Sequence, residues 1–179
     1  MKLYILILVF LANATNMFAQ TKLTPLEEGS KIHFVIKNFG LKTNGSFKGL
    51  KGNIRFDAAN IATAVFDVTV AANTVDTDNG SRDEHLKKES YFNVDKYPII
   101  HLISTAIVAT SKNEEYVFTG NLTIKGISKP VKFNFIAQKQ KDKYLFTGSF
   151  TINRRDFNVG GSSFPLSENV LVSLDVLAK

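Results

Sequence analysis

Apolar residues recur at every second position in eight separate segments of the chain, and this alternation limits the fold more than any other feature. In SKIHFVIKN, Ile32, Phe34 and Ile36 fall on one side of an extended chain, and Lys31 and Lys37 fall on the other. Successive side chains of a β-strand point to opposite faces, so each segment predicts a strand with one apolar face. The other seven segments are GNIRFD, AVFDVTVAA, YPIIHLIST, EYVFTGNLTI, VKFNFIA, YLFTGSFTI and VLVSLDVLA.

Eight such strands in sequence, separated by turns containing Gly, Asn and Asp, predict an all-β protein folded as an antiparallel barrel or sandwich. A barrel is favoured because segments such as AVFDVTVAANTV and YVFTGNLTI are long for a sandwich. Glycines also recur within the predicted strands, where they allow the coiling and the corners that closure requires. These are Gly45, Gly49, Gly52, Gly120 and Gly148.

Phenylalanine is prominent in the predicted interior, because the chain contains 15 Phe and no Trp. Phe supplies apolar area without a polar group that needs a partner. Such an interior can be filled by its own side chains or can hold the tail of a lipid, and the residue types alone do not separate the two. We expect a ligand tunnel, where present, to be lined by Phe34, Ile36, Phe47, Ile54, Phe56, Phe66, Val68, Val70, Ile100, Leu102, Phe118, Leu122, Ile124, Phe133, Phe135, Phe146, Phe150, Ile152, Val170, Val172 and Leu174.

The N-terminal segment has the features of a secretory signal peptide. Lys2 precedes the apolar run LYILILVFLA, which is shorter than the ~20 apolar residues of a membrane-spanning helix. We expect cleavage after Ala19, so that residues 1–19 are removed and residues 20–179 form one barrel domain. The expected location is the periplasm or the exterior of the cell, and an uncleaved anchor is the alternative reading.

The charge pattern argues against a nucleic-acid partner. The formal net charge is +6, but the basic residues are scattered and Arg is scarce. Nucleic-acid-binding proteins usually concentrate such charge on one face. We expect at most a peripheral contact with anionic lipid head groups. The chain also has no Cys, so no disulfide can add to the stability of the core.

The stretch DNGSRDEHLKKESYFNVDKYP predicts one short helix between two strands. Ser81 and Glu84 form the S-x-x-E pattern of a capping box. Arg82 and His85 are three residues apart and should share a helix face. The side chains of Arg82, Asp83 and His85 are then either capping and helix-to-barrel contacts or a head-group site at the barrel mouth.

A second polar cluster, NRRDFNVGGSSFP, follows a predicted strand. Its glycines allow a loop that can move. Arg154 and Asp156 are either paired with neighbouring groups for structural reasons or line the mouth.

No arrangement of residues in the sequence predicts catalysis or a metal site. The chain has no Cys nucleophile and no G-x-S-x-G motif, and the serines of GGSS have no recognisable His or acid partner. His33, His85 and His101 lack the spacing of metal ligands, and His33 and His101 fall on the outward face. We therefore expect a protein without a catalytic residue, metal or cofactor.

Several motifs resemble, in order and spacing, those of the YceI-like family of polyisoprenoid-binding, lipocalin-like proteins of the bacterial envelope. They are SKIHFVIKNFG, NGSFKGLKGNIRFD, NTVDTDNGSRDEHLKKESYFNVDKYPIIHLIST, FTGNLTIKGISKPVKF, INRRDFNVG and VLVSLDV, which together cover nearly all of residues 20–179. The chain departs from the family pattern at Asn38, Leu102 and Asn158, where a His, an aromatic residue and a Gly are frequent.

The resemblance implies an extended eight-stranded antiparallel, lipocalin-like β-barrel with one short helix beside it. Its tunnel would hold a long-chain amphiphile, such as a polyisoprenoid, an isoprenoid quinone or a fatty-acid derivative, for binding, sequestration or transport. Members of the family are exported and are often homodimers, so a homodimer is one expected state. The resemblance carries no catalytic residue to this chain.

Two other functions remain open from the sequence. One is an envelope interaction or stress-response module without a ligand, which predicts a filled barrel and an outward apolar patch or dimer seam at Val35, Ile99 and Ile103. The other is an enzyme that acts on a bound isoprenoid through His85.

Overall fold

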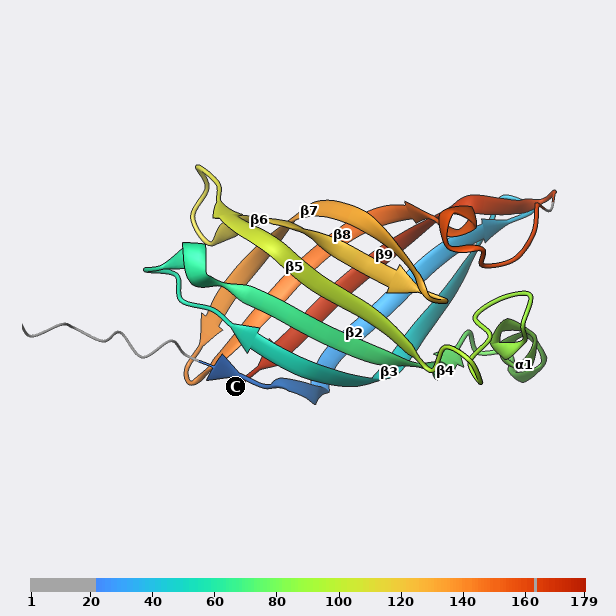
Figure 1. Ribbon diagram of the computed structural model, residues 1–179, viewed down its shortest axis with the longest axis horizontal. Coiled ribbons are helices and arrows are strands. Elements are labelled where there is room, and N and C mark those ends of the chain that lie inside the picture. The colour runs from blue at the N-terminus through green and yellow to red at the C-terminus, as the bar shows by residue number, and fades with distance from the viewer. Residues whose placement is uncertain (1–21, 163) are drawn as a thin grey trace, which may run out of the picture.

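The computed structural model describes residues 22–162 and 164–179, which form one long antiparallel sheet (Figure 1). The expected signal peptide, residues 1–19, lies outside the described residues. The strands are β1 (Lys22–Leu23), β2 (Pro25–Asn38), β3 (Leu41–Arg55), β4 (Val65–Asp76), β5 (Ile99–Ala109), β6 (Glu115–Ile124), β7 (Ile127–Gln140), β8 (Lys143–Asn153) and β9 (Leu166–Ala178). One α-helix, α1 (Gly80–Lys87), and two 3₁₀ helices, η1 (Ile61–Thr63) and η2 (Arg154–Phe157), connect them.

The sheet closes into an eight-stranded antiparallel barrel, which confirms the predicted fold. Strands β2 to β9 follow the order β3-β2-β9-β8-β7-β6-β5-β4, and pairing of β3 with β4 completes the circle. The two-residue strand β1 pairs with the far end of β3. Closure leaves the long strands without exposed hydrogen-bonding edges.

Two tight hairpins fix the strand register at one end of the barrel. Phe39 and Gly40 connect β2 to β3, and Lys125 and Gly126 connect β6 to β7. All four residues have positive φ angles, as the central residues of a type I′ turn require. The pairing that follows places Phe34 opposite Gly45.

Gly45 lets the barrel wall and an aromatic ring approach each other closely. The ring of Phe34 lies over Gly45, where a Cβ atom would overlap the ring. A side chain at position 52 is also excluded by sterics, since a Cβ atom there would overlap the backbone of Asp67 on β4. The φ angle of Gly52, +139°, further favours glycine at this position. Two of the strand glycines therefore serve close packing within the wall, which differs from the predicted role in coiling and corners.

The two ends of the barrel differ. At one end the interior is packed with aromatic rings, and Phe56 contacts the rings of Phe66, Tyr116 and Phe146 at centroid distances between 5.1 and 6.2 Å. Burial among these rings raises the pKa of the Tyr116 hydroxyl. We call this end the closed end, and the C-terminal strand finishes beside it (Figure 1).

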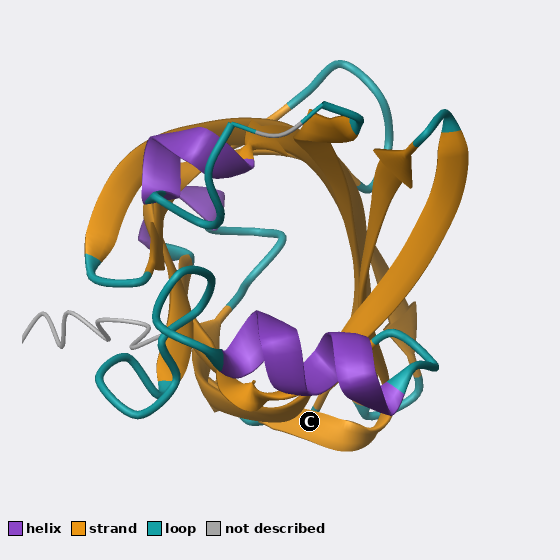
Figure 2. Cartoon of the chain, turned by 90° about the vertical axis from the view of Figure 1, so that its right-hand side faces the viewer, coloured by secondary structure: helices purple, strands orange, loops and turns teal. Residues whose placement is uncertain are grey.

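The opposite end, which we call the mouth, carries α1 and η2. Viewed along the barrel, α1 lies along one side of the mouth and η2 lies on the other (Figure 2). The two sides are joined by a backbone hydrogen bond from Gly160 N to the Ser90 carbonyl oxygen, 2.9 Å long. The segments that follow α1 and η2 therefore meet across part of the rim.

Candidate functional site: an apolar cavity with a cationic rim

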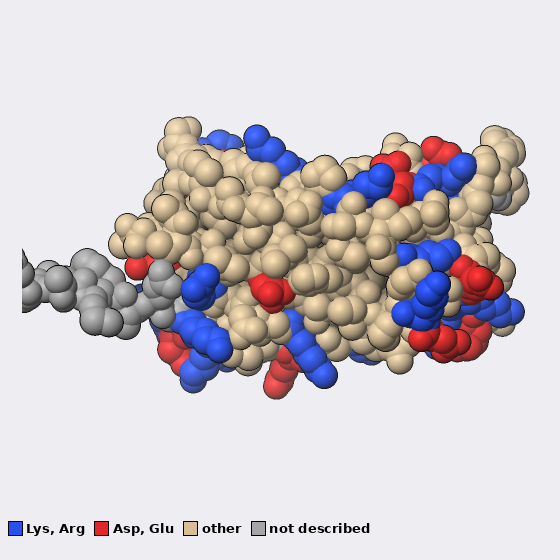
Figure 3. All heavy atoms as spheres, viewed as in Figure 1, with Lys and Arg blue, Asp and Glu red and all other residues tan. Residues whose placement is uncertain are grey.

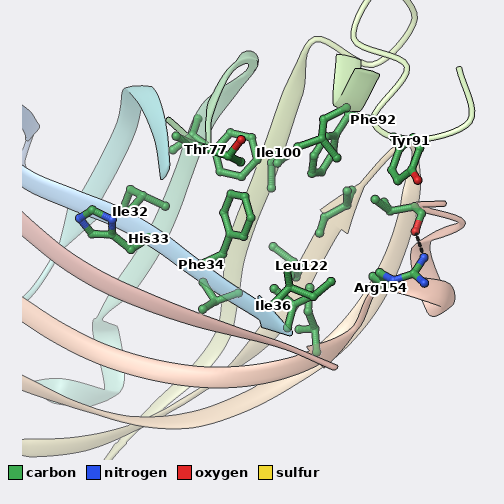
Figure 4. Close-up of a pocket in the computed structure, with 18 of the residues that line it drawn as sticks. Ile32, His33, Phe34, Ile36, Thr77, Tyr91, Phe92, Ile100, Leu122 and Arg154 are labelled. Atoms are coloured by element: carbon green, nitrogen blue, oxygen red, sulfur yellow. Dashed lines mark hydrogen bonds between the residues drawn. The ribbon is translucent and has the colours of Figure 1, made fainter. Parts of the chain in front are cut away.

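A cavity of about 320 Å³ occupies the mouth half of the barrel. Its wall is mostly aliphatic and phenylalanine side chains from β2, β3, β4, β5, β6, β8 and β9 (Figure 4). Several of these side chains are only half-buried, although they point inward. Inward apolar groups that remain accessible indicate a hollow interior rather than a filled core.

Fourteen of the residues expected to line a tunnel lie on the wall of this cavity. They come from seven of the eight barrel strands and form a continuous apolar surface. They are Phe34, Ile36, Phe47, Val68, Val70, Ile100, Leu102, Leu122, Ile124, Phe150, Ile152, Val170, Val172 and Leu174.

The remaining seven expected residues do not line the cavity. They point inward as the alternation predicts, but they fill the closed end and pack against one another. They are Ile54, Phe56, Phe66, Phe118, Phe133, Phe135 and Phe146. The cavity is therefore shorter than the barrel, because aromatic side chains occupy the interior of its other half.

Other cavity residues escaped the sequence analysis for different reasons. Ile32 and Val176 lie on the predicted inward stripes of their strands, so the alternation could have found both. Leu50 follows a register irregularity between β3 and β4, which the alternation alone does not reveal. Tyr91 and Phe92 reach the cavity from the segment between α1 and β5. This segment is not a strand, so the alternation of apolar residues cannot identify its inward side chains.

Helix α1 is held at the mouth by hydrogen bonds to one buried threonine. Arg82 Nε donates to Thr77 Oγ1 at 2.7 Å, and Arg82 Nη2 donates to the Thr77 carbonyl oxygen at 2.6 Å. Asp83 Oδ1 accepts from the backbone N–H and the hydroxyl of Thr77. Thr77 is only 5% exposed, so these contacts fix the start of α1 against the end of β4.

The N-cap of α1 differs from the one predicted. The Asn79 side chain accepts a hydrogen bond from Arg82 N at 3.0 Å, and the helix begins at Gly80. Ser81 therefore lies inside the first turn instead of capping it. Glu84 instead pairs with Lys87 at 2.7 Å on the exposed surface.

Among the expected mouth residues, Arg82, His85 and Arg154 line the cavity. The His85 ring packs against the Tyr91 ring, with centroids 4.8 Å apart. Asp83 is not part of the cavity wall because its carboxylate bonds to Thr77. Asp156 is exposed and also lies outside the wall.

Arg154 is a buried cation that holds the loop after η2. Its side chain is 4% exposed, and its guanidinium donates to the carbonyl oxygens of Ser167, Val159 and Gly161 at 3.0, 2.7 and 3.1 Å. Figure 4 shows Arg154 near Tyr91 at one end of the cavity. Three carbonyl dipoles solvate the guanidinium but carry no net negative charge.

The ionisable side chains that line the cavity are those of arginine, histidine and one tyrosine. Arg82 and Arg154 line it together with His33 and His85, and no Asp or Glu does so. Within residues 22–162 and 164–179, neither arginine forms an ion pair with a carboxylate. Arg82 and Arg154 are therefore the permanently charged side chains on the cavity wall.

The remaining histidines lie on the outer surface, as predicted. His33 is exposed on β2, although it also borders the cavity. His101 contacts Asp67 on the neighbouring strand, with Nε2 and Oδ1 2.7 Å apart. In the part of the chain that the structure describes, no three His, Asp or Glu side chains are grouped to hold a metal ion. No helix in the same part is long and apolar enough to cross a membrane.

The barrel and its motifs match one known domain family. The YceI-like domain matches residues 23–178, from the last residue of β1 to the end of β9. The chain belongs to the YceI-like family. This confirms the resemblance found in the sequence.

Two curated relatives show how far the YceI-like similarity extends. A UPF0312 protein of Photorhabdus laumondii is 38% identical over 104 residues, which cover 58% of this chain and 53% of the relative. Protein YceI of Salmonella arizonae is 33% identical over 114 residues, covering 63% of this chain and 59% of the relative. This chain thus spans little more than half the length of the curated relatives it matches.

Solved structures of YceI-like and related proteins have the same fold. BcnA of Burkholderia cenocepacia has a TM-score of 0.79 at 25% identity, covering 84% of this chain and 96% of BcnA. The Campylobacter jejuni YceI protein has a TM-score of 0.66 at 32% identity, covering 74% and 82%. A polyisoprenoid-binding domain from Saccharophagus degradans has a TM-score of 0.70 at 12% identity, covering 88% and 97%, a likeness of fold alone.

Proposed function

We propose that this protein binds, and thereby sequesters or transports, a long-chain amphiphilic lipid in the mouth half of its barrel. The candidate ligands are a polyisoprenoid, an isoprenoid quinone and a fatty-acid derivative. The observation that carries the proposal is the apolar cavity of about 320 Å³, lined by inward side chains that remain accessible. An apolar tail that enters this cavity leaves water, at a gain of ~0.8 kcal/mol per buried CH₂.

The rim of the cavity favours a head group that accepts hydrogen bonds, and an anionic one most strongly. Arg82 and Arg154 carry positive charge at the cavity wall, and no carboxylate lines the same wall. A carboxylate or phosphate at the rim would meet one of these guanidinium groups, and charge-assisted hydrogen bonds are the strong class. At Arg154, which is buried, a charge is screened less than in water, whereas Arg82 is exposed.

The proposal describes a binding protein and assigns no chemical step to it. Two histidines border the cavity, and within the described residues neither His33 nor His85 pairs with an Asp or Glu side chain. The family and the shape of the cavity support this reading. The expected export to the periplasm or the cell exterior is part of the same proposal, since lipids of the envelope are available there.

The first experiment identifies what the protein carries. Organic extraction of the protein purified from its native host, followed by mass spectrometry, should yield a lipid with a long apolar tail in near-stoichiometric amount. Absence of any lipid from the extract, together with no binding of a fatty-acid probe to the delipidated protein, would contradict the proposal.

The second experiment tests the cationic rim. In competition against one fluorescent fatty acid, an unlabelled fatty acid should bind roughly tenfold more tightly than the fatty alcohol of equal length, which corresponds to ~1.4 kcal/mol. Arg82→Met should remove most of this preference, and binding of the alcohol is compared in the same variant because Arg82 also anchors α1 to Thr77. Arg154→Met should do the same where its loop stays folded.

Arg155→Met is the matched control for these two variants. Arg155 adjoins Arg154 in η2, but it is exposed and pairs with Glu168 at 3.2 Å, and it does not line the cavity. This variant should keep the preference for the fatty acid. An equal loss in all three variants would show that net charge, not position at the rim, sets the preference.

A further inference from the structure

The three most exposed large apolar side chains of the described residues lie at one tip of the mouth. Phe39 and Leu41, in and beside the β2–β3 turn, are each 74% exposed, and Phe164, before β9, is 98% exposed. The two segments are neighbours, because Phe39 N donates to the Pro165 carbonyl oxygen at 3.3 Å. We call these three side chains the tip patch.

The tip patch adjoins the opening of the cavity without forming its wall. Asn38 and Leu166, which pair across β2 and β9, both line the cavity, and each is within two residues of a patch residue. None of the three patch side chains lines it. The tip lies at the upper right of Figure 1, and the face in Figure 3 shows no charged atoms there.

The backbone conformation at position 39 favours a residue other than phenylalanine. Phe39 has φ of +49°, a left-handed conformation that Asn or Gly adopts at lower cost at this position of a type I′ turn. The chain therefore places a large apolar side chain in water at a position where a polar one suits the turn better. Exposed apolar surface of this kind marks a contact with a partner.

From Gly29 onward, the charged side chains of the β2–β3 hairpin behind the tip patch are all basic. Between Gly29 and Phe56 the chain has six Lys and Arg residues and no Asp or Glu, and all six side chains are exposed. The two nearest the tip, Lys37 and Lys42, are directly opposite each other across β2 and β3. Like charges in this arrangement repel each other, and a nearby anionic surface would relieve that repulsion.

We propose that the tip patch and the basic hairpin dock on a bilayer that contains anionic lipid, with the mouth facing the membrane. Apolar residues flanked by lysines match a surface with anionic head groups above acyl chains. A second copy of the chain suits the tip less well, because a symmetric contact would bring two pairs of lysines together. This inference extends the proposed function, since a docked mouth would let a lipid tail pass between bilayer and cavity without crossing water.

Vesicle flotation of the purified protein tests the inference. Vesicles of phosphatidylcholine with about one third phosphatidylglycerol should bind it, and phosphatidylcholine alone should bind it at least tenfold more weakly. The triple variant Phe39→Asn, Leu41→Thr and Phe164→Ser should lower the affinity more than tenfold. Phe39→Asn suits the turn, so loss of binding would not reflect a loss of folding.

Two matched variants control for exposure and charge. Val108→Thr changes a side chain that is 57% exposed near the closed end, and it should bind vesicles as the wild type does. Lys37→Gln with Lys42→Gln should lower the affinity about fivefold per lysine, whereas Lys132→Gln with Lys139→Gln on β7 should have a much smaller effect. Unchanged vesicle binding in the triple variant would overturn the proposal.

Two further outcomes separate this inference from its alternatives. If light scattering shows a dimer that only the triple variant dissociates, while vesicle binding persists, the tip patch is a self-association surface and the proposal is overturned. Binding of the fatty-acid probe in solution should be the same in the triple variant and the wild type. A wild type that binds vesicles but no probe would contradict the proposed function and leave the docking surface standing.

Discussion

At the scale of single residues, a glycine keeps the cavity open. Phe34 lines the cavity, and its ring lies flat over Gly45 on the neighbouring strand and 5.5 Å from the Phe47 ring. Any side chain at position 45 would push the Phe34 ring away from the wall. The ring would then occupy space that the proposed lipid tail needs.

Gly45→Ala should therefore lower both stability and ligand affinity. We expect a loss of about 1–3 kcal/mol in the free energy of unfolding, as for other overpacked sites, measured by chemical denaturation. Binding of the fatty-acid probe should weaken as the ring moves inward. Gly80→Ala is the control, because a Cβ atom there would meet nothing within 4 Å and alanine suits a helix. Equal effects in both variants would exclude the role given to the Phe34 ring.

At the scale of elements, α1 shows what sequence patterns could and could not predict. The pattern correctly indicated one short charged helix between two strands. It placed the cap at Ser81, because S-x-x-E is a common capping motif. Asn79 is an equally good capping residue, and Asp78 before it has φ of +58°, which turns the chain into the helix. Only the path of the backbone from β4 decides between the two caps.

The two caps can be separated by amide hydrogen exchange in α1. Asn79→Ala removes the acceptor of the Arg82 N–H group. The opening free energy calculated from exchange of the α1 amides should therefore fall by about 1 kcal/mol. Ser81→Ala should change it by no more than a few tenths of a kcal/mol, because Ser81 is exposed within the first turn. A larger loss of protection in Ser81→Ala would restore the capping box as the better description.

At the scale of the whole molecule, alternation predicted the barrel and the inward face of each strand. It could not predict where the interior is hollow, because Phe56 at the closed end and Phe34 on the cavity wall belong to equivalent apolar stripes. Whether a ring meets other rings or empty space depends on the course of all eight strands around the barrel. The buried contacts of Arg154 were equally hidden, since they go to backbone carbonyls that lie 5 to 13 residues farther along the chain.

The floor of the cavity is a stack of three phenylalanine rings. Phe150 lines the cavity and stacks on Phe133 at a centroid distance of 4.6 Å. Phe133 in turn stacks on Phe118 at 4.7 Å. The last two rings are buried and do not line the cavity, so this row of rings on β6, β7 and β8 leads from the cavity wall into the packed interior. It therefore sets the depth to which a lipid tail can reach.

Phe133→Ala should let the cavity accept a longer tail. Removing this ring opens the floor below Phe150, at an expected cost of about 3–5 kcal/mol in the free energy of unfolding. In competition experiments with a series of fatty acids, the chain length that binds best should shift to longer tails. Phe146→Ala is the control, because this ring is buried among Phe56, Phe66 and Tyr144 away from the cavity wall. It should cost similar stability and leave the preferred length unchanged, and a shift in both variants would mean that general loosening, not the floor, selects the tail.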